Sequence, residues 1–299
     1  MNDSKERIWK KIALFYALTM LFSGVFDAFI LFAGKMDAGN LLYVTGGMWS
    51  PALAAFATKT IFRESIRDLP WKWGGARYAW LGYLIPIAYA LPVYLVVWLS
   101  GLGAFADTDF VKRTAEQFGW AHSPPGLTLA LFILLTATLG LVGKTSRALG
   151  EEIGWRGFLV PELAKVVGFP GVGFISGLMW AVYHFPVLLF ADYNAGTPAW
   201  YGLTCFTLMV VADSFILAWL TLRSGSLWPA AILHGSHNLF IQSIFTPLTR
   251  NTGSTNYIID EFGIGLVVTI AIGAIIVWRQ RGTVANAWRS KNDQPLKGA

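Results

Sequence analysis

The sequence predicts an all-α, polytopic integral membrane protein with about eight transmembrane helices around a polar cavity. Hydrophobic residues make up 55% of the 299 residues and charged residues only 13%, and the mean hydropathy is +0.52. The apolar residues also gather into stretches close to the ~20 residues that a helix needs to cross a bilayer. These stretches span residues 12–34, 41–62, 78–101, 127–143, 168–190, 198–222, 227–247 and 263–278.

The distribution of basic residues predicts the orientation of these helices. If the chain crosses the bilayer at each stretch, most of the 23 Lys and Arg residues fall on the same side as both termini, including Arg147, Arg156 and Lys165. Cytoplasmic loops carry such an excess, so we expect both termini in the cytoplasm. The net charge of +6 is therefore a topological signal, and we expect the lipid bilayer, but no nucleic acid, as a partner.

We expect one integral-membrane domain over residues 1–299. The first apolar stretch is too long for a signal peptide and contains Asp27, so it should remain as a helix. Cys205 is the only cysteine, which excludes an intramolecular disulfide and a cysteine-rich metal site. The polar residues 280–299 predict a flexible cytoplasmic tail.

Two adjacent carboxylates, Glu151 and Glu152, stand near Arg156 in a strongly apolar chain. An ionisable side chain at membrane depth costs about 2.5–3.5 kcal/mol on insertion scales, so the pair predicts a functional site. Glu152 and Arg156 share a helix face in the favourable acid-first order. Glu151 points about 100° away and is left to face a cavity. The alternative is that both acids lie at the cytoplasmic interface beside Arg147 and Arg156.

Histidines in apolar helices are the next candidates. His184 follows a segment in which Gly173 and Gly177 form a small-residue face that lets a neighbouring helix approach closely. Pro186 predicts that the helix kinks or ends just after His184. Taken by itself, a single membrane histidine is more often an interhelical hydrogen-bonding residue than a catalytic one.

His234 and Asn238 are spaced to project from one face of the seventh helix, which allows joint action on one ligand. His237 lies on an adjacent face, and we favour a structural role for it. Asp27 and Asp213 are expected to be packing or cavity residues. The sequence contains no His-Glu-x-x-His, no Gly-Asp and no Gly-x-Ser-x-Gly pattern. These absences disfavour three known protease classes and leave a glutamate, histidine and asparagine constellation.

This constellation resembles a known family, the type II CAAX prenyl endopeptidases and the related CPBP (CAAX protease and bacteriocin-processing) membrane proteins. The family motifs Glu-Glu-x-x-x-Arg, aromatic-x-x-x-His and His-x-x-x-Asn match, in family order, Glu151, Glu152 and Arg156, then Trp180 and His184, then His234 and Asn238. The resemblance covers roughly residues 127–245, which we interpret as a protease-like catalytic core. One departure is Trp180, where the family pattern more often has Phe.

The resemblance implies hydrolysis of a peptide bond within the membrane, near its cytoplasmic face. Glu151 would act as general base on a water molecule that His184 orients or shares a proton with. Glu152 and Arg156 would fix the helix and tune Glu151. The oxyanion donors facing the scissile carbonyl would be His234 and Asn238.

The residues require no cofactor, and the role of a metal stays open. The naming of the family favours a metalloprotease. Glu151, His184 and His234 could then form a zinc site with an open position for water. A metal-free glutamate mechanism explains the same residues. We keep both mechanisms at this point.

The implied partner is a membrane-associated peptide or protein substrate in the plasma membrane of a bacterium or archaeon. It could be a prenylated C-terminus, a peptide pheromone, a bacteriocin-like precursor or a transmembrane segment. One alternative is a non-enzymatic membrane scaffold or immunity protein that binds a peptide in the same cavity. A transporter is a second alternative, which the lack of evident inverted repeats disfavours.

One geometric conflict follows from the predicted helices. If the fifth helix begins at Gly168, His184 lies about 24 Å along it, far from a Glu151 on the cytoplasmic side. Either residues 151–163 enter the membrane, or the fifth helix starts deeper than predicted.

Overall fold

The computed structural model describes residues 2–33, 41–191 and 193–284, and nearly all of this is helical. The long helices are α1 Asn2–Ala33, α2 Leu41–Ile61, α3 Ala76–Ser100, α8 Phe169–Phe190, α9 Ala199–Ser224 and α12 Ile264–Arg279. Two further stretches consist of consecutive pieces: α5 Pro125–Leu135, η3 Thr136–Gly140, α6 Leu141–Glu152, η4 Ile153–Leu159 and α7 Val160–Ala164, then α10 Trp228–His237, η5 Asn238–Phe245 and α11 Thr246–Leu248. The predicted all-α fold and all the predicted helical stretches are confirmed.

The remaining elements are small. They are η2 Ile66–Asp68, β1 Gly103–Phe105, α4 Thr108–Gln117, β2 Thr249–Asn251 and η6 Thr255–Tyr257. Within the described residues, 5 helices are long and apolar enough to cross a membrane, and α12 is a shorter apolar helix. The predicted tail, residues 280–299, lies mostly outside the described residues, which end in a short helical turn at Val284.

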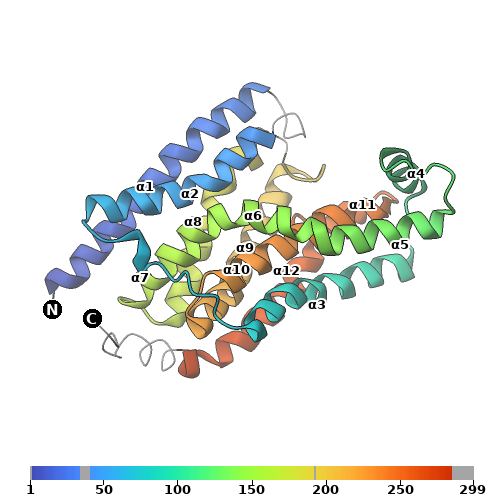
Figure 1. Ribbon diagram of the computed structural model, residues 1–299. Helices are drawn as coiled ribbons and strands as arrows, with labels where there is room; N and C mark the ends of the chain where they lie inside the picture. Colours follow the sequence, from blue (N-terminus) through green and yellow to red (C-terminus); the bar gives the residue numbers. More distant parts are fainter. Residues whose placement is uncertain (1, 34–40, 192, 285–299) are drawn as a thin grey trace.

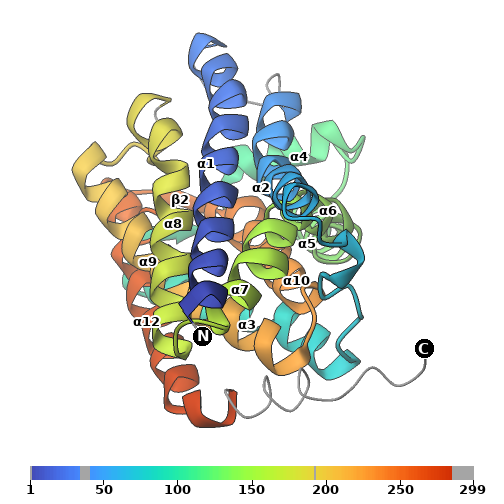
Figure 2. The ribbon, with the colours of Figure 1, turned by 90° about the vertical axis from the view of Figure 1, so that its left-hand side faces the viewer.

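Six helices form a closed ring. α1 packs on α2, α2 on α6, α6 on α10, α10 on α9, α9 on α8, and α8 returns to α1. α3 and α12 lie outside this ring, α3 against α10 and α12 against α9 (Figures 1 and 2). All three sequence motifs lie on helices of this ring, so their side chains can meet inside it.

The distribution of side chains is that of a membrane protein. Large apolar side chains are exposed on the outer surface, among them Phe32, Leu42, Leu99, Leu139, Val142 and Phe190. Charged side chains are buried inside, among them Lys11, Glu151, Glu152, Arg156, Glu162 and Asp213. A soluble protein almost never buries so many charges, whereas lipid is the natural solvent for an apolar exterior.

Successive loops gather at opposite ends of the bundle. At one end, the Lys11 ammonium of α1 lies 2.9 Å from Glu64, which follows α2, and 2.8 Å from Glu162 of α7. The loop after α9 joins this end, because the Leu227 amide donates to the Pro70 carbonyl at 3.0 Å. The loops after the even-numbered predicted helices thus share one end with the start of α1.

The other loops meet at the opposite end. β1, which follows α3, pairs in antiparallel register with β2, which follows α11, so that Ala104 lies opposite Arg250. The Tyr201 hydroxyl at the start of α9 donates to the Tyr257 carbonyl at 2.7 Å. The alternation expected of successive membrane spans is therefore present.

The fourth helix is longer than the sequence predicted. Instead of ending near residue 143, the helical rod runs from Pro125 to Ala164, or 40 residues. At 1.5 Å per residue this is about 60 Å, roughly twice the hydrocarbon thickness of a bilayer. Glu151 lies within this rod and is 2% exposed, so the acidic pair is buried in the protein interior rather than in a surface loop.

The longer rod also resolves the conflict in depth. Residues 151–163 continue as buried helix, which is the first of the two expected solutions, while α8 begins at Phe169 as predicted. Arg156 was counted among the cytoplasmic loop cations, and that assignment is wrong because its side chain is 0% exposed in the interior. The reason is that Arg156 has a buried carboxylate partner, which a count of charges by loop ignores.

Glycines bring α2 directly against the acidic pair. A Cβ atom on Gly150 would lie 2.6 Å from Cγ of Trp49, and one on Gly154 would lie 2.5 Å from Cβ of Pro51. Real Cβ atoms do not come so close, so these two positions require glycine. Because helices in lipid gain stability from close backbone packing rather than from hydrophobic burial, this contact positions the pair.

The predicted small-residue face of α8 is confirmed. A Cβ on Gly173 would meet the Phe215 ring at 2.7 Å, and one on Gly177 would meet Cα of Val211 at 2.7 Å. Both neighbours belong to α9. The close approach of these two helices sets the distance between His184 and the residues of α9 across the cavity.

Pro186 does not end α8, which continues to Phe190. Of the two expected outcomes, a kink or an end of the helix just after His184, the second is therefore wrong. Proline inside a membrane helix is tolerated because neighbouring groups satisfy the backbone that it frees. His184 consequently lies on a continuous helix rather than at a helix end.

Candidate active site

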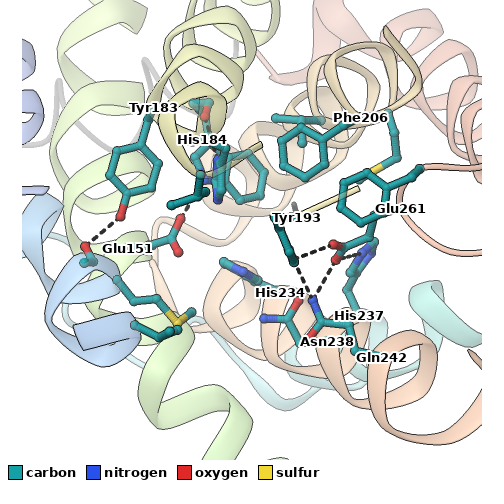
Figure 3. Close-up of a pocket in the computed structure, with 18 of the residues that line it drawn as sticks. Glu151, Tyr183, His184, Tyr193, Phe206, His234, His237, Asn238, Gln242 and Glu261 are labelled. Carbon is teal, nitrogen blue, oxygen red and sulfur yellow. Dashed lines mark hydrogen bonds and ion pairs between the residues drawn. The ribbon is translucent and has the colours of Figure 1, made fainter. Parts of the chain in front are cut away.

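A cavity of about 570 Å³ lies within the ring of helices. Glu151 from α6, His184 from α8, and His234 and Asn238 from the seventh helical stretch all line it (Figure 3). These residues come from motifs far apart in the chain, and the structure brings them to one cavity. The size is typical of a site that encloses a small ligand or a few residues of a peptide.

Glu152 and Arg156 do not line the cavity but support it from behind. The Arg156 Nη1 atom donates to Glu152 Oε1 at 2.9 Å, and both side chains are 0% exposed. Nη2 of Arg156 donates to the Ser214 hydroxyl of α9 at 3.1 Å. The predicted pairing of Glu152 with Arg156 is confirmed. It leaves Glu151 as the member of the acidic pair that faces the cavity.

Trp180 contacts both Glu151, which faces the cavity, and Arg156, which lies behind it. Its indole Nε1 donates to Glu151 Oε2 at 2.6 Å, and its ring covers the Arg156 guanidinium, with Cζ 4.1 Å from the ring centroid. A phenylalanine, the commoner residue in the family pattern, would keep the ring but lack the donor. The indole N–H group therefore gives Glu151 a hydrogen bond that the family pattern, with its commoner Phe, does not predict.

The two candidate catalytic histidines are each oriented through Nδ1. His184 Nδ1 lies 2.9 Å from the Trp180 carbonyl oxygen, which can only accept, so Nδ1 carries the proton. His234 Nδ1 lies 2.9 Å from Glu152 Oε1. An ionised carboxylate can also only accept, so this Nδ1 carries a proton as well. In both rings Nε2 is then left for water or substrate, and neutral His184 presents it as an acceptor.

A second polar group occupies the opposite wall of the cavity (Figure 3). Glu261, in the segment before α12, accepts from His237 Nε2 at 3.0 Å, from Gln242 Nε2 at 2.9 Å and from the Tyr193 hydroxyl at 2.9 Å. Nδ1 of His237 lies 2.6 Å from the Tyr89 hydroxyl. His237 thus lines the cavity and also holds Glu261, which agrees with the structural role favoured from sequence.

Sequence reasoning missed Glu261 and its partners. Burial raises the pKa of Glu261, but the hydrogen bonds and charge of His237, together with the donors of Tyr193 and Gln242, hold it below its usual range. The signal that could have found this group is the acidic pair Asp260 and Glu261 between two apolar stretches. Asp27 and Asp213 also line the cavity, as one of their two expected roles predicted.

The predicted zinc ligands do not form a ready metal site. Among the described residues, no group of three or more His, Cys, Asp or Glu side chains is arranged to hold a metal ion. Glu151, His184 and His234 therefore do not fit a zinc ion as they stand, although all three face the same cavity.

Comparison with known proteins bears on the same segment. Residues 127–240 match the family model described as type II CAAX prenyl endopeptidase Rce1-like. This segment is similar to the type II CAAX prenyl endopeptidase family. A CAAX prenyl protease 2 from Methanococcus maripaludis is 25% identical over 195 residues, which cover 63% of this chain and 64% of that protein. The chain thus matches less than two thirds of the length of this curated relative.

The matched endopeptidase segment contains all seven residues that carried the resemblance, from Glu151 to Asn238. It does not contain Asp27 of α1 or Glu261 before α12, which line the same cavity. One wall of the cavity therefore lies in the family segment, and other parts of the wall come from elsewhere in the chain.

We predict that Glu152 and Arg156 are strongly coupled in stability. Glu152→Gln and Arg156→Met should each destabilise the protein by about 3–5 kcal/mol, because either change leaves an unpaired charge in a low-dielectric interior. The double variant should lose much less than the sum. The measurement is a double-mutant cycle of thermal unfolding in detergent.

The matched control is the pair formed by Glu6 and Lys10, which has the same spacing but is exposed, with a distance of 2.6 Å. Its coupling should stay near the few tenths of a kcal/mol typical of exposed helical pairs. Additive effects of the Glu152 and Arg156 substitutions would contradict the structural pairing.

Proposed function

We propose that the protein is an intramembrane endopeptidase that hydrolyses a peptide bond of a membrane-associated peptide or protein. The observation that carries this proposal is the convergence of Glu151, His184, His234 and Asn238 on one cavity. A scaffold or immunity protein would need a cavity, but not a carboxylate, two oriented imidazoles and an amide around it. The family of residues 127–240 supports the same function.

In this mechanism Glu151 takes a proton from a water molecule as that water attacks the scissile carbonyl, and it gives this proton to the leaving amine when the C–N bond breaks. Nε2 of neutral His184 accepts a hydrogen bond from the same water and orients it. Trp180 holds the Glu151 carboxylate in one position through its N–H group. The apolar walls exclude bulk water, which strengthens each electrostatic interaction inside the cavity.

His234 and Asn238 are proposed to stabilise the oxyanion. The Asn238 side chain lines the cavity and can donate through its amide. Because Nδ1 of His234 bonds Glu152, donation from Nε2 requires the imidazolium form, which a neighbouring carboxylate stabilises. Glu152 thus supports catalysis indirectly, by fixing His234 as well as Arg156.

The proposed location is the plasma membrane of a bacterium or archaeon, with both termini in the cytoplasm. Support for this orientation comes from the basic residues near Lys11 and Glu64 at the end where α1 begins. The lipid bilayer and a membrane-associated substrate are the proposed partners. The proposed cleavage then takes place in the cavity between the two ends of the ring.

We predict that Glu151→Gln abolishes proteolysis without unfolding the protein. Glutamine keeps an acceptor oxygen for the Trp180 N–H group but cannot act as a base. The rate constant kcat should fall by about 10²–10⁴-fold, the usual contribution of general base catalysis. The assay uses purified protein in detergent with farnesylated CAAX-type peptides and unmodified hydrophobic peptides, and products are identified by mass spectrometry.

The control for this experiment is Glu116→Gln, which changes an exposed glutamate of α4. It should cleave like the parent protein. Full cleavage by Glu151→Gln would show that another group activates the water. A parent protein that binds these peptides but cleaves none of them would favour the scaffold function instead.

We predict that hydrolysis does not depend on a metal ion, because the candidate donors are not arranged as a metal site. Protein treated with 1,10-phenanthroline and shown to be metal-free by elemental analysis should retain its activity. Stoichiometric zinc that is lost in His184→Ala and His234→Ala, together with loss of activity on chelation, would instead establish these residues as ligands.

We predict that Trp180 is a positioning residue for Glu151. Trp180→Phe should lower kcat by about tenfold or more with little change in KM, because a hydrogen bond to a charged group contributes about 1.5–3 kcal/mol. Trp155→Phe is the matched control, since Trp155 is also fully buried but its indole nitrogen has no hydrogen-bond partner. Equal losses in the two variants would reduce the role of Trp180 to packing.

A further inference from the structure

The cavity has an unbalanced charge. Its acidic lining residues are Asp27, Glu151, Asp213, Asp260 and Glu261, and its other ionisable lining residues are histidines and tyrosines. In the described part of the lining there is no Lys or Arg. Apolar walls reduce screening, so a cavity with this lining concentrates a negative potential and attracts cations. Whether one of these carboxylates can bind a cation depends on the partners that it already has.

Three of these carboxylates already have partners. Glu151 accepts from Trp180, and Glu261 accepts from three side chains. Asp260 accepts from the backbone amide of Glu261 at 2.6 Å. Asp213 has one oxygen without a hydrogen bond. The nearby Arg156, His234 and His237 nevertheless interact electrostatically with its carboxylate.

Asp27 differs from all of these. It lies on α1, is 9% exposed, lines the cavity, and its Oδ2 atom has no hydrogen-bond partner. No neighbouring charge acts on it among the described residues. A buried carboxylate without a partner is costly in an apolar interior, and the cost falls when a cation arrives. Asp27 also lies outside the segment that matches the endopeptidase family.

We propose that Asp27 forms a subsite that binds a basic side chain, lysine or arginine, of the substrate. This proposal rests on the proposed proteolytic function and names its substrate class: a membrane-associated peptide with a basic residue near the bond that is cut.

The test compares peptides that differ by one charge. A peptide that the purified protein cleaves is prepared as a series in which a single lysine occupies each position in turn, with a norleucine counterpart for each. Norleucine has nearly the same shape but no charge. At one position, kcat/KM should be about tenfold or more higher for lysine, in line with the contribution of a buried charge pair.

Asp27→Asn should reduce this lysine preference to near one, because the amide keeps the shape and removes the charge. Asp109→Asn, an exposed residue of α4, is the matched control and should keep the parent preference. Cleavage without any lysine preference in the parent protein overturns the proposal, and this comparison needs no variant. A preference that persists in Asp27→Asn overturns the assignment to Asp27.

A binding measurement separates this proposal from the proposed function. Glu151→Gln is titrated with fluorescently labelled lysine and norleucine peptides, and the dissociation constants are obtained from anisotropy. Tighter binding of the lysine peptide, lost in the double variant with Asp27→Asn, supports the subsite even if the parent protein cleaves nothing. Cleavage with equal binding of both peptides refutes the subsite and leaves the proteolytic function intact.

Discussion

One buried guanidinium determines how the helices meet around the cavity. Arg156 is enclosed in an apolar interior, where its charge is tolerated only beside a carboxylate. Glu152 supplies that carboxylate, and the same oxygen also lies 2.9 Å from Nδ1 of His234 on α10. Ser214 of α9 and the ring of Trp180 of α8 complete its surroundings. Four segments of the chain must therefore come together at this point, because an unpaired charge there would cost several kcal/mol.

The position of the candidate base follows from this pairing. Adjacent helical residues point about 100° apart, so fixing Glu152 toward Arg156 turns Glu151 toward the cavity. A π-helical segment, η4, begins directly after the acidic pair, and such segments often occur at functional sites. Close contact of α2 at Gly150 keeps this part of the rod in place. The position of Glu151 thus depends on the pair of Glu152 and Arg156, and the indole of Trp180 contacts both Glu151 and Arg156.

The residues that line the cavity come from two parts of the chain, one inside and one outside the segment that matches the family. The groups proposed for bond cleavage lie in residues 127–240, which match the endopeptidase family. Asp27 and Glu261 lie outside this segment, on α1 and before α12. Chemistry and charge selectivity can therefore change independently, because substitutions in the second part leave Glu151, His184 and His234 untouched.

The sequence by itself determined the fold class, the helical stretches and the pairing of Glu152 with Arg156, since these depend on local composition and helix periodicity. It did not determine the length of the fourth helix, because polar residues such as Lys144 and Arg147 interrupt the apolar run while the backbone continues. The contacts of Trp180 and Glu261 were decided only by the tertiary structure. Periodicity shows which face of a helix a residue occupies, but the partner on that face comes from a distant segment, and only the packing of the ring brings the two together.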